Sequence, residues 1–167
     1  LLRKWKVTAA RQDMYEALAD SSYMVAGASL EALAVIQKDT AYPLAKKMLK
    51  TDPRGDLRAA CWDILAERGN AADVDLFEKE SYNVYGRSKI DFAESLSVYM
   101  KNVKDEKALD KALSAYSTLI KTENIRSYRG AIGTYLFDVA RDEKDRIKEA
   151  RTNPEQQEEM RRLDKIK

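Results

Sequence analysis

The side chains that most often carry acid–base or nucleophilic chemistry are scarce in this sequence. Its 167 residues include no histidine and a single cysteine, Cys61. Without histidine the chain has no Ser–His or Cys–His nucleophile pair, no histidine general base and no histidine ligand for zinc or iron. A single thiol forms neither an internal disulfide nor a cysteine metal cluster. We therefore predict no catalytic, cofactor-binding or metal-binding residue in this chain.

Cys61 itself lies in an apolar stripe with Leu57 and Ile64, at helical spacing. A cysteine nucleophile needs a base to form its thiolate, whereas a buried free cysteine behaves as a small apolar residue. We predict that Cys61 packs in a core.

Arg54-Gly55-Asp56 spells a tripeptide that integrins recognise. It follows Asp52-Pro53, where glycine supplies the backbone freedom of a turn and Asp56 can cap a following helix. This context favours a turn over an adhesive site.

Acidic pairs and tyrosines are the other groups that can do chemistry. Asp73 with Asp75, and Glu78 with Glu80, are two residues apart and do not face each other on a helix, so we expect solvated side chains. Six of the nine tyrosines lie between residues 82 and 135. They can stack nucleic-acid bases, but the charge around them is mixed, which favours helix packing with the hydroxyls at the surface.

Charge and hydropathy set limits on the partners. Lys and Arg total 30 against 28 for Asp and Glu, and this balance does not point to nucleic acid or an anionic membrane. The longest apolar runs are far too short to span a bilayer, and no signal peptide is visible. The sequence starts at Leu1 without a methionine, which suggests a fragment. Its composition leaves the compartment open between cytoplasm and bacterial periplasm.

The elements that must position these residues are helices. Apolar residues recur at spacings of three and four, strand-like alternation is absent, and the bulk composition favours helix. We expect about eight helices, including one after Pro43, one capped by Asp105, and four over residues 22–38, 56–68, 86–101 and 125–139. Gly69 should end one helix, and Gly130 and Gly133 should mark a close approach by a neighbouring helix. The expected core includes Leu33, Leu57, Ile64, Leu65 and Leu136.

An internal repeat organises these helices. The pattern around Val25 and Leu33 recurs 32 residues later at Leu57 and Leu65, and again 33 residues after that. Such a period is typical of an α-solenoid. One unit resembles a HEAT repeat in its Pro43, Asp52, Leu57 and Arg58. We predict an all-α, right-handed α-α superhelix, a HEAT-like solenoid of about four helix pairs over residues 1–140. A charged helical tail, 141–167, either docks on a partner or is solvated.

The stretch from about Arg11 to Val139 also resembles a known family. The run Asp20-Ser-Ser-Tyr-Met-Val-Ala-Gly-Ala-Ser-Leu-Glu-Ala-Leu-Ala and the short helix pairs after it are similar to the C-terminal helical domain of bacterial aminopeptidase N-like zinc metallopeptidases. The family's His-Glu-x-x-His helix and Gly-x-Met-Glu-Asn loop are absent. The resemblance implies a non-catalytic domain that packs on a catalytic domain and helps to enclose the peptide chamber, with zinc held by the parent enzyme.

Two alternatives remain open: a free-standing HEAT-like protein-interaction scaffold and, with less support, an enzyme using carboxylates and tyrosines alone. In HEAT-like stacks the second helix of each pair lines the concave side. We predict a mixed-charge protein-binding face there, suited to another protein rather than to a phosphate backbone. Its residues are Glu31, Arg58, Asp63, Arg87, Asp91, Glu94, Arg126 and Arg129.

Overall fold

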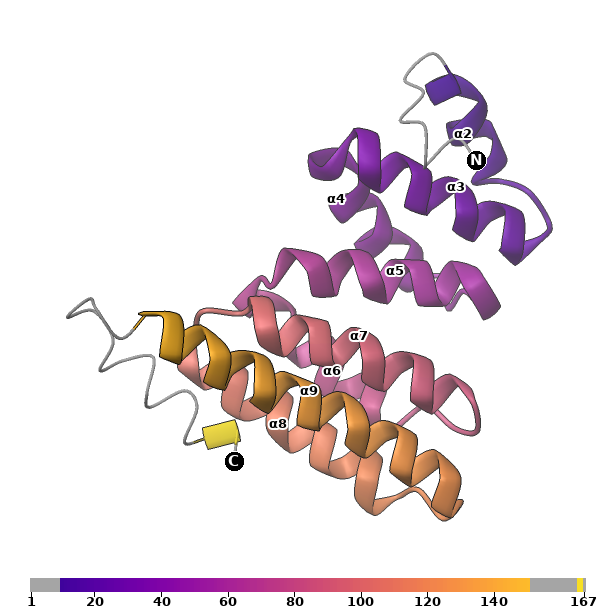
Figure 1. Ribbon diagram of the computed structural model, residues 1–167. Coiled ribbons are helices and arrows are strands. Elements are labelled where there is room, and N and C mark those ends of the chain that lie inside the picture. The colour runs from indigo at the N-terminus through magenta and orange to yellow at the C-terminus, as the bar shows by residue number, and fades with distance from the viewer. Residues whose placement is uncertain (1–9, 151–164, 167) are drawn as a thin grey trace. The chain divides into compact units, whose positions relative to one another are not determined.

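The computed structural model describes residues 10–150 and 165–166. Within these residues the chain forms eight α-helices, one short 3-10 helix and no strand, which confirms the predicted all-α class (Figure 1). The elements are α2 (Arg11–Ala17), α3 (Tyr23–Ile36), α4 (Lys38–Leu49), α5 (Gly55–Arg68), η2 (Ala71–Asp73), α6 (Val74–Ser81), α7 (Ser88–Asn102), α8 (Glu106–Lys121) and α9 (Arg126–Ala150).

The helices divide into two compact units, Leu1–Arg68 and Gly69–Lys167. The division follows the end of α5, where Gly69 has a φ of +58°. Gly69 was expected after a helix end, and the positive φ is the conformation that glycine adopts there at low cost. The predicted boundary between residues 140 and 141 lies inside α9, which continues to Ala150.

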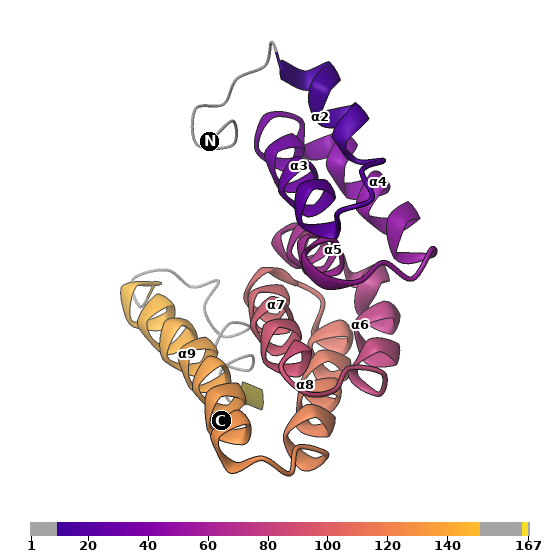
Figure 2. The same cartoon turned by 90° about the vertical axis from the view of Figure 1, so that its right-hand side faces the viewer.

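In unit 1, α3 lies alongside α5, and α4 packs against both (Figures 1 and 2). The close approach depends on Gly27, because a Cβ added there would lie 2.7 Å from the backbone carbonyl carbon of Asp56. No side chain fits in that space without movement of the α5 backbone. On the other side of α3, a small apolar cluster of Met14, Ala32 and Leu33 joins α2 to the unit.

The start of α4 differs from the prediction. The helix was expected to begin after Tyr42-Pro43, but it begins at Lys38 and contains Pro43. The carbonyl of Gln37 accepts hydrogen bonds from the N–H groups of Thr40 and Ala41, both at 3.0 Å, so the first turn is formed before the proline is reached. Pro43 then removes one donor, the one that would bond four residues back.

Unit 2 has an aromatic core. Phe77 of α6 packs against Phe92 and Tyr99 of α7, with ring centroids 5.9 and 4.5 Å apart. The hydroxyl of Tyr99 donates to the carbonyl of Asn70 at 3.1 Å, and that of Tyr116 donates to the carbonyl of Ile132 at 2.6 Å. Tyr99 and Tyr116 therefore pack between helices as predicted, but their hydroxyls lie inside the unit and not at its surface. Tyr82 and Tyr85 do not follow the prediction, because both are exposed in the loop before α7.

Helices α7 and α9 are parallel neighbours, and α8 connects them (Figure 1). Two contacts fix their register: Tyr135 donates to Glu94 at 3.0 Å, and Lys101 lies 2.6 Å from Asp142. Both pairs join residues 41 positions apart, so the two helices run in the same direction. The α8 helix begins at the expected cap, where the Asp105 carboxylate accepts the Ala108 N–H at 2.8 Å.

Burial agrees with the predicted core except on α9. Leu33, Leu57, Ile64 and Leu65 are buried, whereas Leu136 is only half-buried. Among the described residues, α9 packs mainly against α7 and less against α8, and its buried residues are Ile132, Val139 and Glu143.

Two further expectations are wrong at single positions. A Cβ added at Gly130 or Gly133 would meet nothing within 4 Å, so none of the described helices approaches α9 closely there. The internal repeat places Val25 on Leu57, but Val25 is 38% exposed while Leu57 is buried. The α3 residues that turn inward at this level are Ala26 and Gly27, because only small residues fit beside α5.

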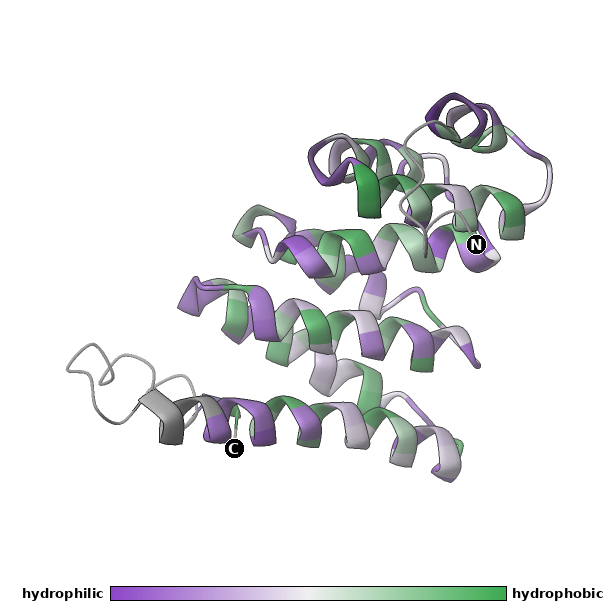
Figure 3. Ribbon diagram, turned by 45° about the horizontal axis from the view of Figure 1, so that its top comes forward, coloured by the Kyte–Doolittle hydropathy of each residue, from purple (hydrophilic) through white to green (hydrophobic). Residues whose placement is uncertain are grey.

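Every described helix carries both hydrophobic and hydrophilic residues (Figure 3). Among the described residues, no helix combines the length and hydropathy that a membrane span requires.

Candidate interaction surface

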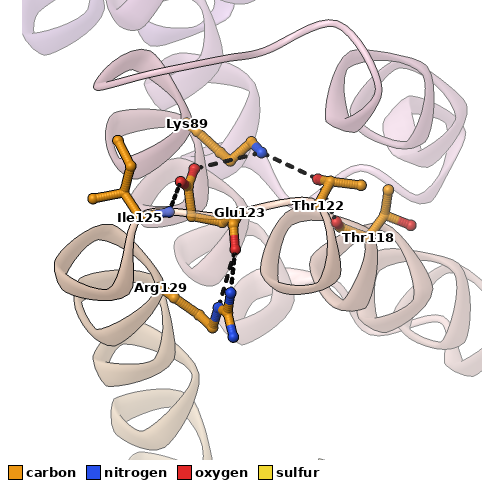
Figure 4. A network of polar contacts seen from close by, with 6 residues as sticks. All are labelled: Lys89, Thr118, Thr122, Glu123, Ile125 and Arg129. Atoms are coloured by element: carbon orange, nitrogen blue, oxygen red, sulfur yellow. Dashed lines mark hydrogen bonds and ion pairs between the residues drawn. The ribbon is translucent and has the colours of Figure 1, made fainter.

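The turn between α8 and α9 is held by a buried ion pair. Lys89, the second residue of α7, and Glu123, in the turn, are each 5% exposed, and the Lys89 Nζ lies 3.5 Å from the Glu123 Oε2 (Figure 4). The same ammonium donates to the Thr122 hydroxyl at 3.1 Å. The first turn of α7 is thereby joined to the end of α8.

Glu123 also organises the first turn of α9. Its carboxylate accepts the Ile125 N–H at 2.8 Å, and its backbone carbonyl accepts two hydrogen bonds from Arg129, at 3.0 Å from Nε and 2.7 Å from Nη2 (Figure 4). The Ile125 N–H and then the Lys89 ammonium hold the pKa of Glu123 below its ordinary value. Lys89 and Glu123 are thus a partnered charge pair that sets where α9 begins.

Around this network lie five of the eight residues predicted for the interaction face. Arg87, Asp91, Arg126 and Arg129 are exposed in the first turns of α7 and α9 or just before them, and Glu94 is exposed one turn further along α7. Partial burial, followed by the hydrogen bond to Glu94, raises the pKa of Tyr135. The α7–α9 pair therefore gathers these five side chains on one part of unit 2.

The other three predicted residues belong to unit 1. Asp63 is exposed and Glu31 is half-buried. Arg58 is also half-buried, and its Nη1 lies 2.6 Å from the Asp52 carboxylate and 3.2 Å from the Pro53 carbonyl. This geometry makes Arg58 part of the turn before α5 as well as a candidate for binding.

The groups with candidate chemistry occupy separate places. Cys61 is fully buried, as predicted, and burial raises the pKa of its thiol to about 12. Arg54 precedes α5, and Gly55, with a φ of +52°, is the first residue of the helix. Asp56 therefore lies inside the first helical turn and does not precede it, as the expected cap would. Among the described residues, no group of three or more acidic or cysteine side chains is placed to hold a metal ion.

The acidic pairs of η2 and α6 differ from the expected solvated arrangement. Asp73 and Glu80 are buried, whereas Asp75 and Glu78 lie 2.7 and 3.7 Å from the Lys111 ammonium. The two buried carboxylates are seven residues apart, which is two helical turns, so they point to the same side. Because the two members of a pair are two residues apart, they point to different sides, and one carboxylate of each pair is buried while the other faces Lys111.

The charged tail is described only in part. Residues 151–164 and 167 lie outside the described residues. The Lys165 Nζ lies 2.9 Å from Asp110 and 3.5 Å from Glu106, and Ile166 is 6% exposed. Lys165 therefore lies against α8 of the same chain.

The geometry reveals a pattern that the sequence reasoning missed. Arg58 reaches back six residues to the Asp52 side chain, and Arg129 reaches back six residues to the Glu123 carbonyl. The signal was present in the sequence as an acidic residue followed six positions later by arginine at both helix starts.

No family model, curated protein or solved structure matches this chain.

Proposed function

We propose that this chain is a non-catalytic helical scaffold that binds another protein through the exposed side chains of α7 and α9. The observation that carries the proposal is the set of five charged residues on these two helices, of both signs, placed over a start of α9 that is tied to α7 by a buried ion pair. A rigid support with mixed charges suits a protein surface, because opposite charges on a partner can be matched in one register only.

The HEAT-like solenoid belongs to this proposal. The contact of Arg58 with Asp52 at the start of α5 supports it, because the HEAT pattern places an Asp in the turn and an arginine at the opening of the second helix. In the predicted superhelix, α7 and α9 would line the concave side.

A narrower form of the proposal rests on the resemblance given above. In that form the partner is the catalytic domain of a zinc aminopeptidase, the chain itself binds no zinc, and the Arg87, Asp91 and Glu94 side chains face that domain or its peptide chamber. The purified chain should then show no turnover of an aminoacyl anilide.

Site-specific photo-crosslinking tests the proposal. A crosslinking amino acid is placed at Glu94 and, as the matched control, at the exposed Lys107 of α8, in cells that produce the full-length protein. We expect a discrete crosslinked protein from position 94 and none from position 107. Identical products from both positions, or none from position 94, would contradict the proposal, and a product containing a His-Glu-x-x-His segment would support the aminopeptidase form.

A further inference from the structure

Unit 2 exposes three large apolar side chains at one end. Tyr82 is 70% exposed, Tyr85 is 83% exposed, and Ile125 is 49% exposed. The two tyrosines lie in the loop before α7, and Ile125 lies in the turn before α9. The contacts of Lys89 with Thr122 and Glu123 bring this loop and this turn to the same end of the helices (Figures 1 and 4).

Basic side chains share this end of the unit. Residues 69–167 contain equal numbers of acidic and basic residues. Within the segments 82–91 and 121–129, however, the exposed charges are mostly basic: one carboxylate, Asp91, stands beside Arg87, Lys121, Arg126 and Arg129. The charges of the buried pair, Lys89 and Glu123, offset each other. We call the exposed set of Tyr82, Tyr85, Arg87, Lys121, Ile125 and Arg126 the basic edge.

We infer that the basic edge binds an acidic peptide segment that carries aromatic or aliphatic side chains. The inference rests on the proposed function and specifies its partner. Charge complementarity selects the carboxylates, and the N-terminal ends of α7 and α9, which carry partial positive charge, lie at the same edge. Tyrosine and arginine are the residue types that most often dominate binding energy at protein interfaces.

A peptide fits the edge better than a single-stranded nucleic acid does. Nucleic-acid grooves combine a track of cations with aromatic platforms on which successive bases stack. Here one of the three exposed apolar side chains, Ile125, is aliphatic and offers no stacking face, and Asp91 lies among the cations. Both features suit a peptide with mixed side chains.

The test uses defined polymers and the full chain. Binding of a random copolymer of glutamate and tyrosine is measured by fluorescence anisotropy and compared with polyglutamate and with oligothymidylate. We expect the copolymer to bind most tightly, polyglutamate more weakly because the aromatic contacts are lost, and oligothymidylate most weakly.

Paired charge reversals locate the site. Arg87→Glu with Arg126→Glu should weaken copolymer binding about tenfold or more, because each reversal replaces an attraction to the carboxylates with a repulsion. The matched control, Lys104→Glu with Lys107→Glu, reverses two exposed lysines at the start of α8, at the opposite end of that helix, and should change binding by less than about twofold. Tyr82→Ser with Tyr85→Ser should weaken the copolymer several-fold and leave polyglutamate unchanged.

The inference is overturned by an equal loss in the lysine control, by absence of copolymer binding, or by tighter binding of oligothymidylate. Circular dichroism of each variant verifies folding. If Glu94 crosslinks a partner while the copolymer does not bind, the scaffold proposal stands and only the acidic-peptide inference fails.

Discussion

The turn before α5 in unit 1 and the turn before α9 in unit 2 use the same arginine contact with different outcomes. In both, an arginine in the first helical turn reaches back six residues. Arg58 bonds to the carboxylate of Asp52, whose side chain is 78% exposed. Arg129 bonds instead to the backbone of Glu123, which leaves that carboxylate to pair with Lys89 inside the unit. The arginine contact of unit 1 stays within the turn before α5. In unit 2, the Lys89–Glu123 pair and the Lys89–Thr122 hydrogen bond add a link from the turn before α9 to α7 and to the end of α8.

The two units also differ in the size of the side chains that pack between their helices. Unit 1 brings α3 and α5 together by using small residues, with Gly27 against the α5 backbone. Unit 2 fills the space between helices with rings, those of Phe77, Phe92 and Tyr99. Close packing of backbones tolerates no added atom, whereas packing through rings depends on the contact area of large side chains.

The largest expected effect is loss of a core side chain in unit 1. Leu65 is fully buried, so Leu65→Ala should lower the free energy of unfolding by about 2–5 kcal/mol. Chemical denaturation with helical circular dichroism measures it. A change below about 0.5 kcal/mol is typical of a surface site and would contradict the packing described for α5.

The second prediction compares the two turns directly. Lys89→Met leaves the buried Glu123 carboxylate without its ammonium partner and should destabilise the protein more than Arg58→Met, because exposed ion pairs contribute only about 0–1 kcal/mol. Thermal melts of the two variants provide the measurement. An equal or smaller effect of Lys89→Met would show that the two turns contribute alike.

The ion pair also predicts a pH dependence. The folded pKa of Glu123 lies below the ordinary value of 4.5, so its stabilising contribution is present above that pH and is lost as pH falls through the lowered pKa. The stability difference between the unmodified protein and Glu123→Gln should therefore be largest near neutral pH and shrink in acid. A difference that stays constant down to strongly acidic pH would contradict this assignment.

The fourth prediction tests the close approach of α3 to α5 in unit 1. Gly27→Ala places a methyl group against the backbone of Asp56 and should destabilise by about 1–3 kcal/mol, the usual cost of overpacking. Hydrogen exchange of the α3 and α5 amides measures it within unit 1. Unchanged exchange rates would mean that α3 and α5 are further apart than described.

The smallest effect has the opposite sign. Gly133 lies within α9, and a Cβ there meets nothing within 4 Å, so Gly133→Ala should stabilise by about 0.5–1 kcal/mol. It is the matched control for Gly27→Ala, and thermal denaturation detects it. A destabilising Gly133→Ala would reveal a neighbour on that face of α9.

Helix content was predictable from the sequence because the apolar spacing and the caps are local signals. Asp105 and Gly69 act through bonds or torsions within a few residues, and both predictions are confirmed. Pro43 was misplaced because the first turn of α4 is formed by the Gln37 carbonyl, upstream of the apolar pattern. Local rules therefore identified the helices but misplaced the start of α4.

Other features depend on which elements meet. Leu136 has the same helical spacing as Leu65, but α9 packs closely on α7 and only slightly on α8, whereas α5 packs closely on both α3 and α4, so Leu136 remains half-buried. Glycines look alike in sequence, yet Gly27 faces a backbone and Gly130 faces open space. The candidate surface was predicted as a set of charges, but the exposed Tyr82 and Tyr85 beside Arg87 emerge only when the loop is placed in space.

Cys61 gives unit 1 a reporter of its own opening. It is the only thiol in the chain, it is fully buried in α5, and its raised pKa keeps it protonated at neutral pH. A thiol-specific dye can reach it only when α5 separates from its neighbours, so the labelling rate measures how often that happens per unit time. Unit 2 holds no cysteine. Labelling with one thiol reagent therefore measures the opening rate of unit 1 without a contribution from unit 2.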